Sequence, residues 1–197
     1  VVGYNKYYGW YMGETEDFGP WMDTFHEKNP DTPLCISEYG AEGIIEYHTD
    51  TPKVKDYTEE YHALYHEMVW KMYSERPYLW ATYVWNMFDF GANIRDEGGV
   101  KGRNNKGLIT YDRKLKKDAF YMYKANWTTD KFVHLTGKRY IERVGDETTF
   151  KVYTNCDAVT LIVDGKEVET KEAVDHKVVF EHVELSDAET FVKVVGD

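Results

Sequence analysis

A short apolar run that leads to a carboxylate constrains this chain more than any other feature of its sequence. Pro33 precedes the run Leu34–Ile36, and Gly40 follows Glu38. An apolar run of this length between two such residues predicts a buried β-strand. In a parallel α/β barrel the carboxyl ends of the strands carry the chemistry, so Glu38 is a candidate catalytic residue. The alternative is a structural Glu in an ion pair at the end of a strand.

Two other segments predict strands of the same sheet. Leu79–Phe88 is almost continuously apolar, which fits a strand buried on both faces of a parallel sheet. Val1–Tyr4 predicts a shorter strand that brings Asn5, Tyr7 and Tyr11 to its carboxyl end. Helices are predicted at residues 21–28, 56–75 and 118–127. The first part of the chain, residues 1–127, is therefore predicted to be an α/β domain.

The pattern changes at about Thr128. Short alternating stretches follow, separated by turns, and Asp164-Gly165 is a hairpin signal. Such evenly spaced stretches predict a small β-sandwich over residues 128–197. Strands are expected at residues 132–135, 149–153, 159–163, 178–180 and 191–195.

Composition narrows the range of partners. The formal net charge is −11, which argues against nucleic acid and anionic lipid, since both require basic patches. The sequence contains no run of 18 or more apolar residues, so no membrane span is expected. Cys35 and Cys156 fall in different predicted domains, so no disulfide is expected. His62 and His66 are four residues apart, but without the zinc-protease pattern they predict surface or helix-packing positions and no metal site.

Several segments, taken in chain order, resemble glycoside hydrolase family 2. This family includes β-galactosidases, β-glucuronidases and β-mannosidases. The resemblance extends over nearly the whole chain and rests on Asn5–Tyr11, Ile36–Ala41, Tyr83–Phe90, Asp96–Gly99, Lys106–Lys114 and Lys116–Tyr121. The segments Asp96–Gly99 and Lys116–Tyr121 look most like the bacterial β-galactosidase branch.

The resemblance implies only part of a (β/α)8 barrel. Such a barrel has eight strands and usually 200 residues or more, whereas three strands fit before residue 128. By resemblance these are the sixth, seventh and eighth strands, followed by an immunoglobulin-like domain. The chain begins Val1-Val2 without an initiator Met, so we expect a C-terminal fragment of a larger glycosidase.

The resemblance also assigns the chemistry. Retaining glycosidases use two carboxylates roughly 5 Å apart. The match makes Glu38 the nucleophile and Tyr7 the tyrosine that donates a hydrogen bond to it. The acid/base of the family is a Glu after Asn, and no Asn-Glu dipeptide occurs in this sequence. Asp89 stands at another predicted strand end, but the family does not use that position as the acid. We therefore expect the chain alone to be inactive.

The substrate is expected to be a terminal β-galactoside cleaved in exo fashion. Trp85 matches an aromatic residue that lines the sugar pocket, with core packing as its alternative. Asn104 and Lys106 form the Asn-x-Lys pattern that binds the substrate carboxylate in β-glucuronidases, which makes a β-glucuronidase fragment the alternative. Val100, where glucuronidases often carry an Arg, counts against it. The substrate-binding candidates are Asn5, Tyr11, Trp85, Asn104 and Lys106.

A second class of function stays open, a non-catalytic carbohydrate-binding module with aromatic platforms. The Glu38 motif speaks against it, because a binding module has no need of an ionised Glu beside a Tyr donor. No cofactor is expected. The expected partners are a glycan substrate and either further copies of the chain or the missing N-terminal domains. The compartment cannot be read from the sequence.

Overall fold

The computed structural model describes residues 1–186 and 189–197. Its contacts divide the chain into two compact units, Val1–Ala119 and Phe120–Asp197. The expected boundary after residue 127 remains a prediction, and the division in the sequence between Ala119 and Phe120 falls within α3 (Asp118–Trp127). Among the described residues, no helix is both long and apolar enough to cross a membrane.

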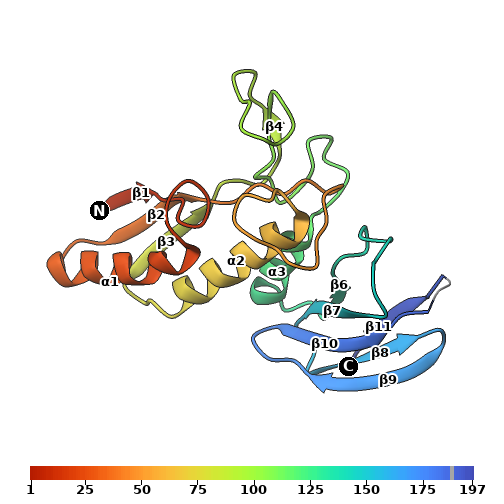
Figure 1. Cartoon of the computed structure of the whole chain (residues 1–197). Helices are drawn as coiled ribbons and strands as arrows, with labels where there is room; N and C mark the ends of the chain where they lie inside the picture. Colours follow the sequence, from red (N-terminus) through yellow and green to blue (C-terminus); the bar gives the residue numbers. More distant parts are fainter. Residues whose placement is uncertain (187–188) are drawn as a thin grey trace. The chain divides into compact units, whose positions relative to one another are not determined.

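The first unit is built on a parallel three-stranded sheet. Its strands are β1 (Val2–Asn5), β2 (Leu34–Tyr39) and β3 (Leu79–Val84), and β2 lies in the middle (Figure 1). Leu34, Cys35 and Ile36 are buried, as the apolar run predicts. The three strands are parallel, so their carboxyl ends meet at one edge, where Glu38 lies opposite Asn5.

The third strand is shorter and more exposed than predicted. It ends at Val84, because the residues that follow pair with a different segment: the Asn86 amide donates to the Lys106 carbonyl, and the Leu108 amide donates to the Asn86 carbonyl. Trp80 and Tyr83 are 53% and 54% exposed. The expectation of burial on both faces is therefore wrong for β3, since it is an edge strand of the described sheet.

Two longer helices accompany this sheet, α1 (Phe18–Lys28) and α2 (Glu59–Ser74). The helix predicted from Asp56 starts later, because the Thr58 hydroxyl accepts the Tyr61 amide and caps it. The α2 face turned inward carries Tyr61, Tyr65, Val69 and Tyr73 together with His62 and His66, all buried. The two histidines thus occupy packing positions in the core, and the surface alternative is wrong.

The described residues of the second unit form two antiparallel three-stranded sheets. One has the order β10-β7-β6 and the other β11-β8-β9. Their strands are β6 (Val133–Leu135), β7 (Glu147–Thr154), β8 (Ala158–Val163), β9 (Lys166–Glu172), β10 (Lys177–Glu184) and β11 (Val192–Gly196). The shared core contains Phe150, Val152, Val159, Leu161, Val178, Phe180 and Val183.

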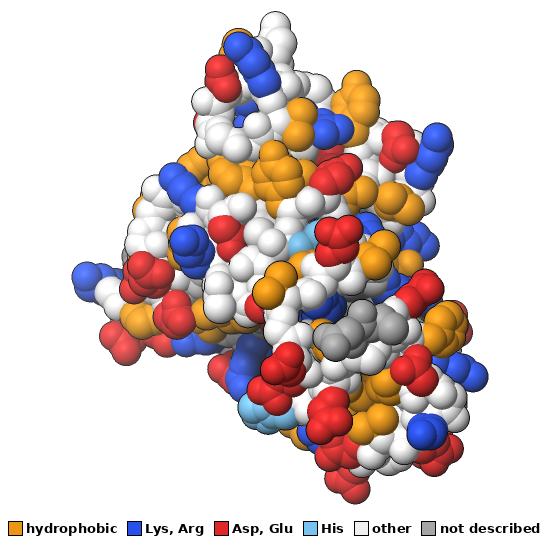
Figure 2. All heavy atoms as spheres, turned by 45° about the vertical axis from the view of Figure 1, so that its right-hand side comes forward, with side chains coloured by type: hydrophobic (Ala, Val, Ile, Leu, Met, Phe, Trp, Pro, Cys, Tyr) orange, Lys and Arg blue, Asp and Glu red, His pale blue; other side chains and the backbone are white. Residues whose placement is uncertain are grey.

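The predicted hairpin joins β8 to β9. Asp164 and Gly165 both have positive φ, at 49° and 79°, as a two-residue hairpin turn requires. The sequence does not predict the strand β9, because five of its seven residues are charged and its side chains are nearly all exposed. On the face drawn in Figure 2, acidic and basic side chains are interspersed, with smaller apolar areas between them.

A short two-stranded pairing, β4 (Phe90–Gly91) with β5 (Arg103–Asn104), completes the first unit.

We expect the chain to self-associate through the edges of the parallel sheet. Both outer strands have an unpaired side among the described residues, and β3 exposes Trp80 and Tyr83 beside its edge. Light scattering over a dilution series should give an apparent mass that decreases as the protein is diluted. The double substitution Trp80→Lys, Tyr83→Lys should lower that mass at every concentration. A monomeric mass that does not change on dilution would contradict the expectation.

Candidate active site

The carboxylate of Glu38 lies at the carboxyl end of β2 and accepts a hydrogen bond from Tyr7. The Tyr7 hydroxyl is 2.8 Å from Glu38 Oε2, and the Lys6 amide donates to the Glu38 carbonyl at 2.8 Å. Burial, the hydrogen bond and the charge of Glu38 together raise the pKa of Tyr7 well above its ordinary value of 10.0. The phenol therefore stays protonated at neutral pH and remains a donor to the carboxylate.

Close packing fixes the backbone just after Glu38. A Cβ on Gly40 would lie 2.1 Å from the carbonyl oxygen of Trp85, so only glycine fits there. The Trp85 amide in turn donates to the Tyr39 carbonyl at 2.7 Å. Trp85 is thereby placed beside the strand end, with its half-buried ring edge-on to Phe90 at 5.9 Å. This position is compatible with sugar stacking and with packing, and the predicted role stays a prediction.

Asn5 reaches the same edge of the sheet from β1. Its side-chain oxygen accepts a hydrogen bond from the Ser37 hydroxyl at 2.8 Å, and the residue is exposed. Asn5 is thus brought next to Glu38, as predicted, but its contact is with Ser37.

A second carboxylate, Glu42, lies buried four residues beyond Glu38. Its Oε1 accepts hydrogen bonds from Arg95 Nη2 at 2.6 Å and from Lys106 Nζ at 3.1 Å. Its Oε2 accepts from the amide and the side-chain nitrogen of Asn105, both at 3.1 Å. Four donors from two distant segments therefore converge on one carboxylate, which is 2% exposed.

This arrangement keeps Glu42 ionised. Burial alone would raise its pKa, but the Lys106 charge, the Asn105 and Lys106 hydrogen bonds and the Arg95 charge outweigh burial. The net result is a pKa below the ordinary value of 4.5.

Lys106 is enclosed on several sides. Its ammonium donates to the Tyr11 hydroxyl at 3.0 Å and lies 5.3 Å and 4.7 Å from the ring centroids of Trp10 and Tyr11. The side-chain oxygen of Asn104, also buried, accepts the Lys106 amide at 3.0 Å. The Asn-x-Lys pattern therefore forms one compact turn. A substrate role for Asn104 stays a prediction.

A chain of contacts joins the two carboxylates. The rings of Tyr7 and Tyr11 meet edge-on at 5.2 Å, so the Glu38–Tyr7 pair is linked through Tyr11 to Lys106. Four of the predicted site residues, Glu38, Tyr7, Tyr11 and Lys106, are therefore brought together.

Residues missing from the sequence-based prediction complete the cluster. Arg95 Nη2 donates to the Tyr11 hydroxyl at 2.7 Å and to Glu97 Oε2 at 3.0 Å. Glu97 Oε2 also accepts from the Tyr11 hydroxyl at 3.1 Å. Only the position of Glu42 after the Glu38 motif could have drawn attention to it. Arg95 and Glu97 lie in a charged loop whose sequence has no periodicity.

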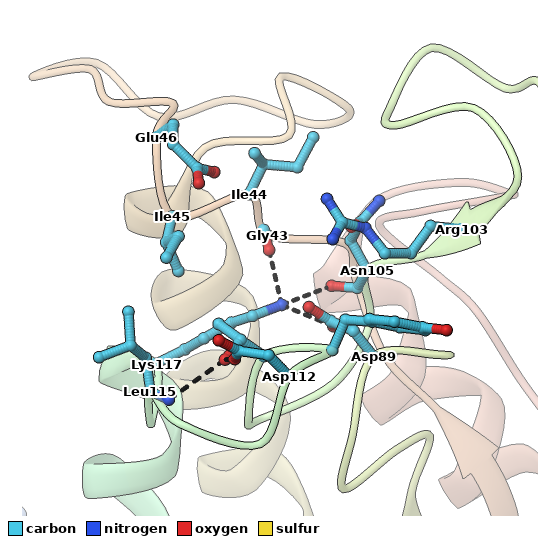
Figure 3. A pocket seen from close by; sticks show the side chains of 12 residues that line it. Gly43, Ile44, Ile45, Glu46, Asp89, Arg103, Asn105, Asp112, Leu115 and Lys117 are labelled. Atoms are coloured by element: carbon cyan, nitrogen blue, oxygen red, sulfur yellow. Dashed lines mark hydrogen bonds and ion pairs between the residues drawn. The ribbon is translucent and has the colours of Figure 1, made fainter. Parts of the chain in front are cut away.

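Asp89 has a structural partner and is excluded as the acid in this arrangement. It is buried, and its Oδ1 accepts hydrogen bonds from Lys117 Nζ at 2.8 Å and the Gly107 amide at 2.9 Å. Figure 3 shows Lys117 reaching also to the carbonyls of Gly43 and Asn105, at 2.7 Å and 2.9 Å. Gly43, Asp89, Asn105 and Lys117 line a cavity of about 330 Å³, and Glu38 is not among the residues that line it. Within residues 1–186 and 189–197, no group of three His, Cys, Asp or Glu side chains is placed to hold a metal ion.

The comparisons with known proteins identify the relatives of the chain. No family model matches. A β-glucuronidase of Bacteroides fragilis is 38% identical over 98% of this chain and 29% of its own length. An FMN-binding β-glucuronidase from Facaelibacterium prausnitzii L2-6 is 54% identical, with a TM-score of 0.94 over 100% of this chain and 30% of that one. Bacteroides uniformis β-glucuronidase 2, bound covalently to cyclophellitol-6-carboxylate aziridine, is 30% identical, with a TM-score of 0.91 over 100% of this chain and 25% of that one.

The chain thus spans less than a third of the length of these relatives. Its homologues are glycoside hydrolases named β-glucuronidases, and it corresponds to the C-terminal portion of such enzymes. The predicted fold is confirmed: the last three strands of a TIM barrel precede an immunoglobulin-like β-sandwich.

The expected specificity for β-galactosides is wrong. The relatives at 38% and 54% identity are β-glucuronidases, although one neighbour at 32% identity is described as a putative β-galactosidase. The segments that favoured galactose have structural roles instead. Gly98 and Gly99 pack against the ring of Tyr57, where a Cβ would come within 3.3 Å and 3.0 Å, and Lys117 binds Asp89.

We predict that Glu42→Gln strongly destabilises the fold. The substitution leaves Lys106 and Arg95 without their shared counter-charge, and removing one partner of a buried pair costs about 3–5 kcal/mol. The matched control is Glu97→Gln, an exposed partner of the same Arg95, with an expected cost of about 0–1 kcal/mol. Urea unfolding of both variants measures the difference. Equal effects would contradict a central role for Glu42.

The contribution of Glu42 should depend on pH. Its pKa in the folded state lies below the ordinary 4.5, so the stabilisation is present above that value and is lost as pH falls through the folded-state pKa. The difference in unfolding free energy between the wild type and Glu42→Gln should therefore be constant near neutral pH and shrink below about 4.5. A difference that does not change down to strongly acidic pH would argue against an ionised Glu42.

Proposed function

We propose that this chain supplies the nucleophile side of the active site of a retaining β-glucuronidase of glycoside hydrolase family 2. The observation that carries the proposal is the hydrogen bond from Tyr7 to Glu38 at the carboxyl end of a parallel strand. The relatives named β-glucuronidase support the substrate class. Lys106, held near Tyr11 and Glu42, supports recognition of an acidic sugar.

In the proposed reaction Glu38 attacks the anomeric carbon of a terminal β-glucuronide. The bond to the leaving oxygen breaks as a general acid protonates that oxygen, and a covalent glycosyl ester forms on Glu38. The same group then removes a proton from water, which attacks the anomeric carbon and releases Glu38. The configuration is retained, because two inversions occur in succession.

Tyr7 serves this reaction by staying protonated. Its hydroxyl stabilises the ionised form of Glu38 before attack and orients the carboxylate oxygen that does not form the ester. The general acid is proposed to come from the part of the parent enzyme that this chain does not match. Asp89 does not serve, because Lys117 and Gly107 hold it inside the fold.

A chimera tests the proposal. This chain would replace the matching part of the Facaelibacterium prausnitzii β-glucuronidase, to which it is 54% identical. We expect hydrolysis of an aryl β-glucuronide, a loss on the order of 10⁴-fold or more with Glu38→Gln, and a loss of about 10- to 100-fold with Tyr7→Phe. The chain alone should show no turnover.

Two results would contradict the proposal. Turnover that survives Glu38→Gln in a folded chimera would remove Glu38 from the nucleophile role. Absence of turnover, with glycan binding by the chain that Glu38→Gln does not alter, would favour a binding module. Circular dichroism and thermal unfolding of each variant establish that the chimera is folded.

A further inference from the structure

A tyrosine of α2 holds the main chain just after Glu38. The Tyr65 hydroxyl accepts a hydrogen bond from the Gly40 amide at 3.1 Å, and both residues are buried. Gly40 lies two residues after Glu38 and has no room for a side chain, since a Cβ would meet the Trp85 carbonyl oxygen. A buried amide without a partner is costly, so this bond fixes the end of β2 against the helix.

A second tyrosine of the same helix holds the main chain just after Tyr7. The Tyr61 hydroxyl donates to the Gly9 carbonyl, and burial raises the pKa of Tyr61 to about 12, so the phenol keeps its proton. Gly9 lies two residues after Tyr7, at a φ of 74°, where a Cβ would clash with Thr15. The Tyr7 carbonyl accepts the Trp10 amide at 3.0 Å, so a displacement of Gly9 is passed on to Tyr7 through one tight turn.

The two phenols lie on one face of α2, about one turn apart. Tyr61 and Tyr65 are four residues apart in the helix, which is a rise of about 6 Å along its axis. Their ring centroids are 6.4 Å apart. Because both side chains come from one turn of one helix, the loops after β1 and β2 are held at a fixed spacing. This spacing sets how the Tyr7 hydroxyl meets the Glu38 carboxylate.

A third buried tyrosine of α2, Tyr73, makes no such bond. It is 4% exposed, and within the described part of the chain its hydroxyl has no hydrogen-bond partner. Its ring packs edge-on against Phe18 and Tyr39, with centroids 5.6 Å and 4.9 Å away. Packing alone therefore accounts for Tyr73, whereas the hydroxyls of Tyr61 and Tyr65 each make a bond that packing does not require.

We propose that Tyr61 and Tyr65 are positioning residues for the nucleophile, Glu38. Between them they hold the Tyr7 hydroxyl against the carboxylate that it stabilises, and they act through main-chain groups without contacting the substrate. The inference rests on the proposed β-glucuronidase function and adds residues that its reaction needs. Substitution of either tyrosine by Phe removes one oxygen and keeps the ring, so the packing of α2 stays in place.

A measurement on the chain itself tests the geometry. The protein would be labelled with ¹³C at the Cζ of its tyrosines, and the Tyr7 signal would be assigned through Tyr7→Phe. We expect this signal to move in Tyr65→Phe and in Tyr61→Phe, because the hydrogen bond to the carboxylate is disturbed. It should stay in place in the matched control, Tyr73→Phe. A Tyr7 signal that moves in neither variant, or moves equally in the control, would overturn the inference.

Kinetics of the chimera give the second measurement. Tyr65→Phe should lower kcat about 3- to 30-fold and change KM less than about 2-fold, because the residue positions a catalytic group and does not bind the substrate. Tyr73→Phe should leave both constants unchanged. In the double variant Tyr7→Phe, Tyr65→Phe the combined loss should fall short of the product of the single losses, since both changes weaken the same hydrogen bond.

The inference and the proposed function fail in different ways. Hydrolysis by the chimera with kcat unaffected by Tyr65→Phe, or losses that multiply in the double variant, would overturn the inference and leave the proposed function in place. A Tyr7 signal that moves as expected, without hydrolysis by the chimera, would overturn the proposed function and retain the positioning of the Tyr7–Glu38 pair. Circular dichroism establishes that each variant is folded, and Tyr61→Phe provides the same kinetic test should Tyr65→Phe fail to fold.

Discussion

The site depends on one buried ionic interaction, the binding of the Glu42 carboxylate by Arg95 and Lys106. A carboxylate at this depth is costly unless it is fully hydrogen-bonded, and here two cationic groups and two donors of Asn105 satisfy it. Arg95 and Lys106 lie 53 and 64 residues away from Glu42 in the sequence. Glu42 therefore fixes where the loop after β3 stands relative to the end of β2.

A second buried ion pair, between Lys117 and Asp89, also holds the 104–106 segment in place. Lys117 joins Asp89 to the carbonyls of Gly43 and Asn105. Because Asn105 donates to Glu42 and accepts from Lys117, the two pairs share one residue. The region next to the Glu38–Tyr7 pair is thus set by a connected polar network that runs from Glu42 through Asn105 to Lys117 and Asp89.

The sequence predicts the parts of this structure that local patterns control. The strand at Leu34–Tyr39, the helix at Asp118–Trp127 and the Asp164-Gly165 hairpin are found as predicted. The sequence offers both Asp56 and Thr58 as the cap of α2, and the structure uses Thr58, so the helix begins after the predicted Asp56. The strand β9 escapes prediction, since a charged exposed strand leaves no periodic signal. The expected galactoside specificity is wrong for a related reason: Gly98 and Gly99 pack closely against the ring of Tyr57, and the sequence does not distinguish such packing from recognition of a sugar.

The reach of Lys117 has a consequence for how such a protein can be recombined. Lys117 bonds back to Gly43, and the amide of the next residue, Asp118, bonds back to Glu59. In each bond one partner is a main-chain group, the Gly43 carbonyl or the Asp118 amide, which another residue at that position also offers. A crossover placed between residues 43 and 118 therefore keeps both bonds as long as the recombined chain carries Lys at position 117 and Glu at position 59.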